Sequence, residues 1–147
     1  MIASIIAGQD LETAVKDTIG ELEAHAGHDQ CARSLNKAIA LVKSGLPAVE
    51  AITRLGEGWV GEEALAISVY CALKHQDNFK KALVASVNHN GDSAITGNIL
   101  GAYLGLSRIP LNWIENVELG EVALQMADDL LPGYQGTREW RERYPGY

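Results

Sequence analysis

The chain has 147 residues, of which 47% are hydrophobic and 21% charged, and its formal net charge is −7. This length and composition indicate a folded protein with a core of useful size and exclude a disordered chain. The acidic balance argues against nucleic-acid binding, which needs a basic face. Since no apolar run approaches about 20 residues, we also expect no membrane span.

Apolar residues at helical spacing predict six helices in the first 87 residues. The first has no capping residue before it, so we expect the chain to start inside an element. Its Ile2, Ile5 and Ile6 form one apolar patch. Asp10 and Asp77 are expected to cap the second and sixth helices. The predicted helices span 2–7, 10–26, 30–44, 47–55, 62–76 and 77–87.

The stretch 86–105 is the one around which we expect the rest of the chain to be arranged. It opens with a polar loop, and Asp92 then stands where a helix N-cap belongs. Gly97, Gly101 and Gly105 recur every four residues on one face of the helix that follows. Because glycine in a helix costs about 1 kcal/mol relative to alanine, the repeat predicts close approach of another backbone or a ligand.

The remaining residues predict two more helices and a tail. A short helix is expected over 110–117, with Trp113, and an amphipathic helix over 119–131. The tail, 134–147, is polar and aromatic, and either docks or frays. No strand pattern is found in the sequence, so the predicted fold is a single all-α domain over 1–147, a multi-helix orthogonal bundle.

Three segments, taken in order, resemble the ADP-ribosylglycohydrolase family. The polar loop and helix match its Asn-His-x-Gly-Asp pattern at Asn88, His89, Gly91, Asp92, Ser93, Thr96 and Gly97. The stretch 56–66, Gly-Glu-Gly-Trp-Val-Gly-Glu-Glu-Ala-Leu-Ala, resembles a second family segment, and Ile109-Pro110-Leu111-Asn112-Trp113 a third. The resemblance runs from Met1 to about Leu131 and covers only the C-terminal half of the family. It implies a partial ADP-ribosylglycohydrolase-like fold.

The family removes ADP-ribose from modified acceptors by hydrolysis that depends on two Mg²⁺ ions. The resemblance leaves Asp92 as the one candidate metal ligand, with an N-cap as its alternative role. Ala94 and Ile95 replace two of the family's ligands, and their side chains have no oxygen with which to coordinate Mg²⁺. The metal motifs of the family's N-terminal half are absent from this sequence. We therefore expect a truncated chain that is inactive alone and binds Mg²⁺ weakly or not at all.

The resemblance also implies candidate ligand-binding residues in the two loops. In the glycine-rich loop these are Gly58 and Trp59, with a tryptophan that fills the core as the alternative. In the polar loop they are His89, Asn90, Gly91 and Ser93, with a loop stabilised by its own side chains as the alternative. Glu62 and Glu63 begin a helix, where carboxylates interact favourably with the helix dipole, which explains them without catalysis.

The sequence leaves three hypotheses for the function. The first is a degenerate ADP-ribosylglycohydrolase, the second a non-catalytic module that binds ADP-ribose, and the third a helical assembly and interaction protein. The apolar N-terminal patch favours a homodimer, or a partner that supplies the missing N-terminal half. Cys31 and Cys71 lie in helical patterns and are interpreted as reduced thiols of a cytoplasmic protein rather than as a disulfide.

Overall fold

The computed structural model describes residues 1–88 and 94–146, and these residues form helices and loops without a strand. The all-α fold class is therefore confirmed. The chain separates into two compact units, Met1–Ile109 and Pro110–Tyr147. The first unit contains α1 (Ile2–Ile6), α2 (Leu11–Glu23), α3 (Asp29–Lys43), α4 (Ala48–Leu55), α5 (Gly61–Lys74), α6 (Phe79–Val87), α7 (Ala94–Leu104) and the 3₁₀ turn η1 (Leu106–Arg108).

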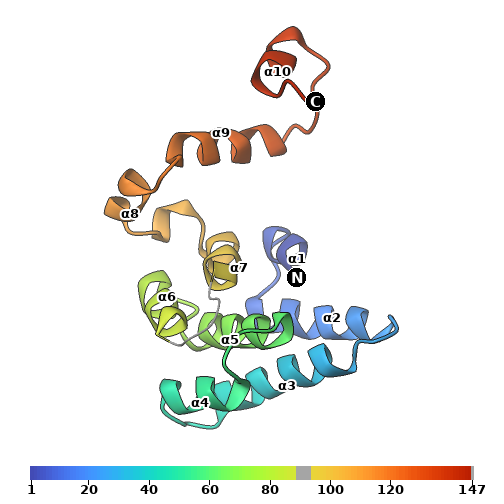
Figure 1. Cartoon of the computed structure of the whole chain (residues 1–147), viewed down its shortest axis with the longest axis vertical. Helices are drawn as coiled ribbons and strands as arrows, with labels where there is room; N and C mark the ends of the chain where they lie inside the picture. Colours follow the sequence, from blue (N-terminus) through green and yellow to red (C-terminus); the bar gives the residue numbers. More distant parts are fainter. Residues whose placement is uncertain (89–93, 147) are drawn as a thin grey trace. The chain divides into compact units, whose positions relative to one another are not determined.

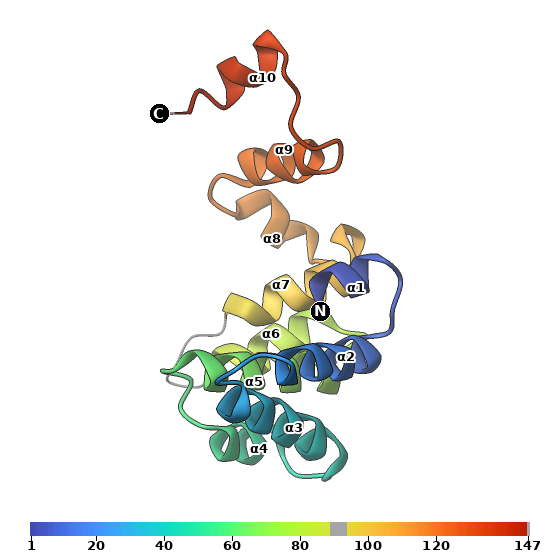
Figure 2. The same cartoon turned by 90° about the vertical axis from the view of Figure 1, so that its right-hand side faces the viewer.

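Helix α5 is the centre of the first unit (Figures 1 and 2). It contacts α2, α3, α4, α6 and α7. Its residues from Ala66 to Leu73 are all buried, so the helix is enclosed on every side rather than on one stripe. A helix that is hydrophobic all round is typical of a core position. The element around which this unit is built is thus α5, and not the stretch 86–105.

Of the two N-caps predicted from the sequence, one is found in the structure and the other is displaced by one residue. Asp10 caps α2, and its carboxylate accepts a hydrogen bond from the backbone N–H of Thr13 at 3.0 Å. The predicted cap at Asp77 is wrong, because Asn78 takes this role and accepts from the N–H of Lys81. Asparagine and aspartate are about equally good N-cap residues, so residue type alone could not decide between Asp77 and Asn78.

The glycine repeat in α7 does not mark a close approach among the described atoms. A Cβ at Gly97 would meet one methyl carbon of Leu83 at 3.6 Å, an ordinary contact, and a Cβ at Gly101 would meet nothing within 4 Å. Helix α7 ends at Leu104, and Gly105 follows it with φ +76°. That conformation favours glycine after a helix end, so the third glycine terminates the helix instead of lining a face.

The three isoleucines of the predicted N-terminal patch do not form one exposed surface. Ile5 is buried with 5% of its surface exposed, while Ile2 is 37% and Ile6 71% exposed. Helix α1 contacts α2 and α7. Ile5 therefore belongs to the core of the first unit, and only Ile6 remains well exposed.

The second unit contains α8 (Leu111–Asn116), α9 (Gly120–Leu130) and α10 (Arg138–Arg143). The tail forms a helix that the sequence left undecided. Thr137 caps α10 by accepting from the N–H of Trp140. Asp129 of α9 binds Arg143 and Tyr144, so the tail docks on α9 through polar contacts.

Among the described residues, no helix has both the length and the apolar character to cross a bilayer.

Candidate functional site

A cleft in the first unit lies where two of the three sequence motifs meet. Helix α4, the glycine-rich loop and the end of α6 enclose a cavity of about 300 Å³. Cavities of this size begin to accommodate small ligands. The lining residues are Ala48, Val49, Ile52, Thr53, Gly56, Glu57, Ala85 and Asn88.

The glycine-rich loop is held in place by one carboxylate. Oε2 of Glu63 accepts hydrogen bonds from the backbone N–H groups of Glu57 at 3.1 Å and Gly58 at 3.0 Å. A Cβ on Gly56 would overlap this carboxylate, so the loop can approach Glu63 only because Gly56 has no side chain. Gly56 has φ +140° and Gly58 has φ +79°, values that L side chains seldom adopt. Glu63 thus does more than interact with the helix dipole.

Trp59 follows this fixed loop directly and is 71% exposed. The interpretation of Trp59 as a tryptophan that fills the core is therefore wrong. Gly58 is buried, and its N–H is already donated to Glu63. The loop presents an indole ring to solvent, while Gly58 provides the backbone geometry that makes this possible.

Five predicted site residues lie outside the described residues: His89, Asn90, Gly91, Asp92 and Ser93. Asn88 comes just before them, lines the cleft and donates from Nδ2 to the backbone oxygen of Val84 at 2.6 Å. Thr96 lies after them in α7 and is fully buried. Asn88 thus lies at the cleft and Thr96 in the core of the first unit.

The described residues do not fit a magnesium site. Within 1–88 and 94–146, no three histidine, cysteine, aspartate or glutamate side chains come together as metal ligands would. Ile95 is in the first turn of α7 and offers only a hydrocarbon side chain. Since Mg²⁺ requires an octahedron of oxygens, we assign no metal-dependent step to these residues.

The two cysteines offer no nucleophile. Both are free thiols, as predicted from their helical patterns. Burial raises the pKa of Cys71 to about 12, and burial followed by the charge of Glu62 raises the pKa of Cys31. A thiol with a raised pKa is mostly protonated at neutral pH and reacts slowly.

Two parts of this site were not predicted from the sequence. The first is the contribution of α4, where Val49 and Thr53 line the cleft from the outer face of the helix. The only signal in the sequence was Val49, an apolar residue off the buried stripe. The second is the pair of hydrogen bonds that Glu63 accepts from the loop. The sequence indicated it only by a carboxylate that follows Gly56 by seven residues and Gly58 by five.

A comparison with protein families gives one match. The family model described as ADP-ribosylglycohydrolase matches residues 1–140 of the 147. No curated protein and no solved structure matches the chain.

Proposed function

Since the chain belongs to the ADP-ribosylglycohydrolase family, we propose that it binds ADP-ribose, free or attached to an acceptor, and does not hydrolyse it alone. The observation that carries this proposal is the loop fixed by Glu63, which lines the cleft with Gly56 and Glu57 and is followed by an exposed Trp59. An exposed indole suits an adenine ring, since stacking a base on an aromatic side chain contributes about 1–3 kcal/mol.

The absence of hydrolysis is proposed from the residues at the family's metal motif. The side chains of Ala94 and Ile95 have no ligand atoms, and the carboxylate of Asp92 alone would bind Mg²⁺ weakly. We propose that the purified chain holds no tightly bound Mg²⁺. An activity would then require a partner chain that supplies the remaining ligands.

Calorimetry with ADP-ribose tests the binding proposal. The wild-type chain is expected to give saturable heat. Trp59→Ala is expected to weaken binding about 5- to 150-fold, as the loss of one stacked base implies. Trp59→Phe is the matched control, because it keeps an aromatic face and should retain most of the affinity. Because Trp59 is exposed, neither variant should unfold the chain. No heat from the wild-type chain would refute the proposal.

An assay for release of ADP-ribose from a modified protein, with and without Mg²⁺, tests the proposed lack of activity. We expect no release above background. The double variant Ala94→Asp with Ile95→Ser should also stay inactive, because it restores one ligand set only. Mg²⁺-dependent turnover by the wild-type chain would show that the ligands are complete after all.

A helical assembly protein is the second candidate, and exposed apolar residues favour it. In the first unit Ile6 and Trp59 are each 71% exposed. We propose a homodimer of a cytoplasmic protein in which Ile6 lies in the contact, and Ile6→Asp should shift the population towards monomer. Light scattering at tens of micromolar would settle the point, and a wild-type monomer would exclude the dimer. If the ADP-ribose titration gave no heat and light scattering showed a dimer, assembly would be favoured over ADP-ribose binding.

A further inference from the structure

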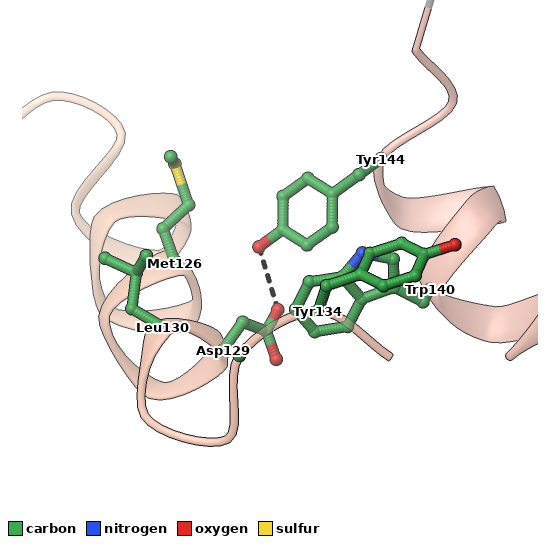
Figure 3. Close-up of a pocket in the computed structure, with 7 residues that line it drawn as sticks. Met126, Asp129, Leu130, Tyr134, Trp140 and Tyr144 are labelled. Carbon is green, nitrogen blue, oxygen red and sulfur yellow. Dashed lines mark hydrogen bonds between the residues drawn. The ribbon is translucent and has the colours of Figure 1, made fainter. Parts of the chain in front are cut away.

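A second cavity, in the second unit, has no role in the proposed function. It has a volume of about 220 Å³ and lies between α9 and the tail that follows it (Figure 3). Figure 3 shows Met126 and Leu130 on the helix at one side and the aromatic rings at the other, with Asp129 between them. The lining residues are Met126, Asp129, Leu130, Gly133, Tyr134, Trp140 and Tyr144.

The three aromatic rings are inclined to one another instead of stacked in parallel. Tyr134 and Trp140 meet edge to face, with centroids 6.0 Å apart and planes at 84°. Trp140 and Tyr144 are 5.1 Å apart at 53°. Rings set at such angles can present several negatively polarised faces to one small volume, which is how aromatic cages bind quaternary ammonium groups.

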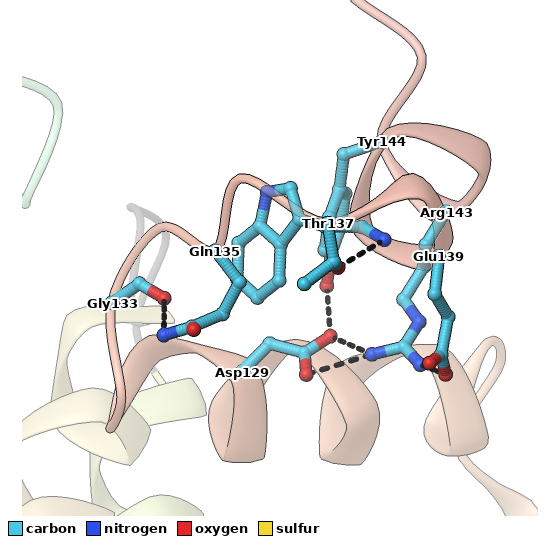
Figure 4. Close-up of polar contacts among 8 residues, drawn as sticks. Asp129, Gly133, Gln135, Thr137, Glu139, Arg143 and Tyr144 are labelled. Atoms are coloured by element: carbon cyan, nitrogen blue, oxygen red, sulfur yellow. Dashed lines mark hydrogen bonds and ion pairs between the residues drawn. The ribbon is translucent and has the colours of Figure 1, made fainter.

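A carboxylate forms part of the same wall. Asp129 accepts two hydrogen bonds from the guanidinium of Arg143, at 2.7 and 2.8 Å, and one from the hydroxyl of Tyr144 at 2.8 Å (Figure 4). The bonds from Arg143, followed by that from Tyr144, lower the pKa of Asp129, so this group stays ionised at neutral pH. Glu139 binds the other side of Arg143 at 2.9 Å.

The charges around the cavity favour a cation over an anion or a neutral ligand. Arg143 faces a neighbouring hollow and is not part of this wall, and two carboxylates offset its charge. Residues 110–147 have seven carboxylates and three arginines, a formal net charge of −4. A cation with a large hydration shell would be unsuited to an apolar wall. An alkylated ammonium group, which is weakly hydrated, suits both the rings and the charge.

We propose that the cavity formed by Tyr134, Trp140, Tyr144 and the α9 residues binds the alkylated ammonium group of a methylated lysine on a partner polypeptide. The source is indicated by the neighbouring hollow, which shares Met126 and Tyr144 with the cavity and continues along α9 to Glu121. A polypeptide that inserts a lysine into the cavity has room in this hollow for its flanking residues. A free ammonium compound would leave the hollow empty.

The test is a titration of the full chain followed by NMR, with the indole N–H signal of Trp140 as the reporter. The chain has three tryptophans, and Trp140→Phe assigns the signal. The probes are a short peptide with one trimethyllysine, the same peptide with unmodified lysine, choline, and the neutral isostere of choline, 3,3-dimethylbutan-1-ol. We expect the trimethyllysine peptide to bind most tightly, and choline to bind more tightly than its neutral isostere.

Each comparison decides a separate part of the proposal. If the neutral isostere binds as well as choline, the cavity is simply apolar and the cation site is refuted. If choline binds as tightly as the trimethyllysine peptide, the polypeptide source is refuted. If the unmodified peptide binds equally, methylation has no part in recognition. These comparisons use the wild-type chain, so they do not depend on whether a variant folds.

Two variants at Tyr134 test whether its aromatic ring contributes to binding. Tyr134 is 75% exposed, so its replacement should leave the rest of the unit folded. Tyr134→Leu keeps apolar bulk and removes the aromatic face, and should weaken the trimethyllysine peptide about two- to fivefold, as expected for one cation–π contact at an exposed site. Tyr134→Phe keeps the face and should bind as the wild type does. Equal affinities of the two variants would exclude the ring from the site.

Discussion

Within the described chain, every buried side chain lies between Ile5 and Leu100, whereas α8, α9 and α10 bury none. Both units are helical, and both have amphipathic helices. The first unit surrounds α5 with five other helices, and the second holds its tail by an ion-pair network and an aromatic cluster. An apolar stripe in the sequence therefore predicts a helix, whereas the burial of that stripe depends on how many other helices pack against it.

The largest expected effect is the loss of a core side chain from the first unit. Ile67 has no exposed surface. Ile67→Ala should lower the free energy of unfolding by about 2–5 kcal/mol, from lost burial and the cavity left behind. Urea denaturation followed by circular dichroism measures it.

The matched control for that substitution is Leu130→Ala in the second unit. Leu130 is 78% exposed, so the same kind of truncation should change the free energy of unfolding by about 0.5 kcal/mol or less. Equal costs at the two positions would remove the contrast between the units.

The second effect concerns the loop fixed by Glu63. Glu63→Ala leaves the N–H groups of Glu57 and Gly58 without their acceptor, and should cost about 1–3 kcal/mol of stability. Both bonds go to the same oxygen, so Glu63→Gln, which keeps one carbonyl oxygen, should cost much less. Thermal unfolding of the two variants is the measurement. If Glu63→Gln were as unstable as Glu63→Ala, the charge rather than the acceptor would fix the loop.

The third effect is a stabilisation at the start of α9. Leu119 has φ +57°, the left-handed conformation, and is 69% exposed. A non-glycine residue there costs about 1–2 kcal/mol, and glycine loses more freedom on folding by about 0.5–1 kcal/mol. Leu119→Gly should therefore protect the amide hydrogens of α9 slightly better against exchange.

Leu131→Gly is the control for Leu119→Gly. Leu131 is equally apolar and 85% exposed but has φ −64°, so no strain is relieved there. Slower exchange in both variants would show that a removed leucine, and not relieved backbone strain, stabilises α9.

Most helices could be predicted from the sequence, because their apolar periodicity is local. Asp10 as a cap followed from residue type and position alone. The central place of α5 did not, since Ala66 and Ser68 are small and were not recognised as part of a fully buried run. Burial on all sides depends on which helices pack against an element, and this is a property of the whole fold.

The candidate site was predictable only in part, for a similar reason. The glycine-rich loop was identified from its composition, but the bond from Glu63 depends on how the chain turns between Gly56 and Gly61. The exposure of Trp59 was open from sequence, since tryptophan occurs both in cores and at binding surfaces. The contact of Asp129 with Tyr144 joins residues 15 positions apart, across a tail with no periodic pattern.

The smallest effect is a local loosening of the second unit at acidic pH. It is expected there because an ion pair holds the tail of this unit, whereas buried apolar side chains hold the first unit. The hydrogen bonds of Arg143 and then Tyr144 lower the pKa of Asp129 from its usual 3.8. A group whose pKa is lower in the folded state stabilises that state fully above its unfolded pKa, and the stabilisation is lost as the pH falls through the folded pKa. Docking of α10 on α9 should thus be intact at neutral pH and weaken below about pH 3.8. Asp129→Asn should release the tail at every pH, and the NMR signal of the Trp140 indole reports both changes. Loosening of α10 that begins near pH 6 in the wild-type chain would instead point to another titrating group.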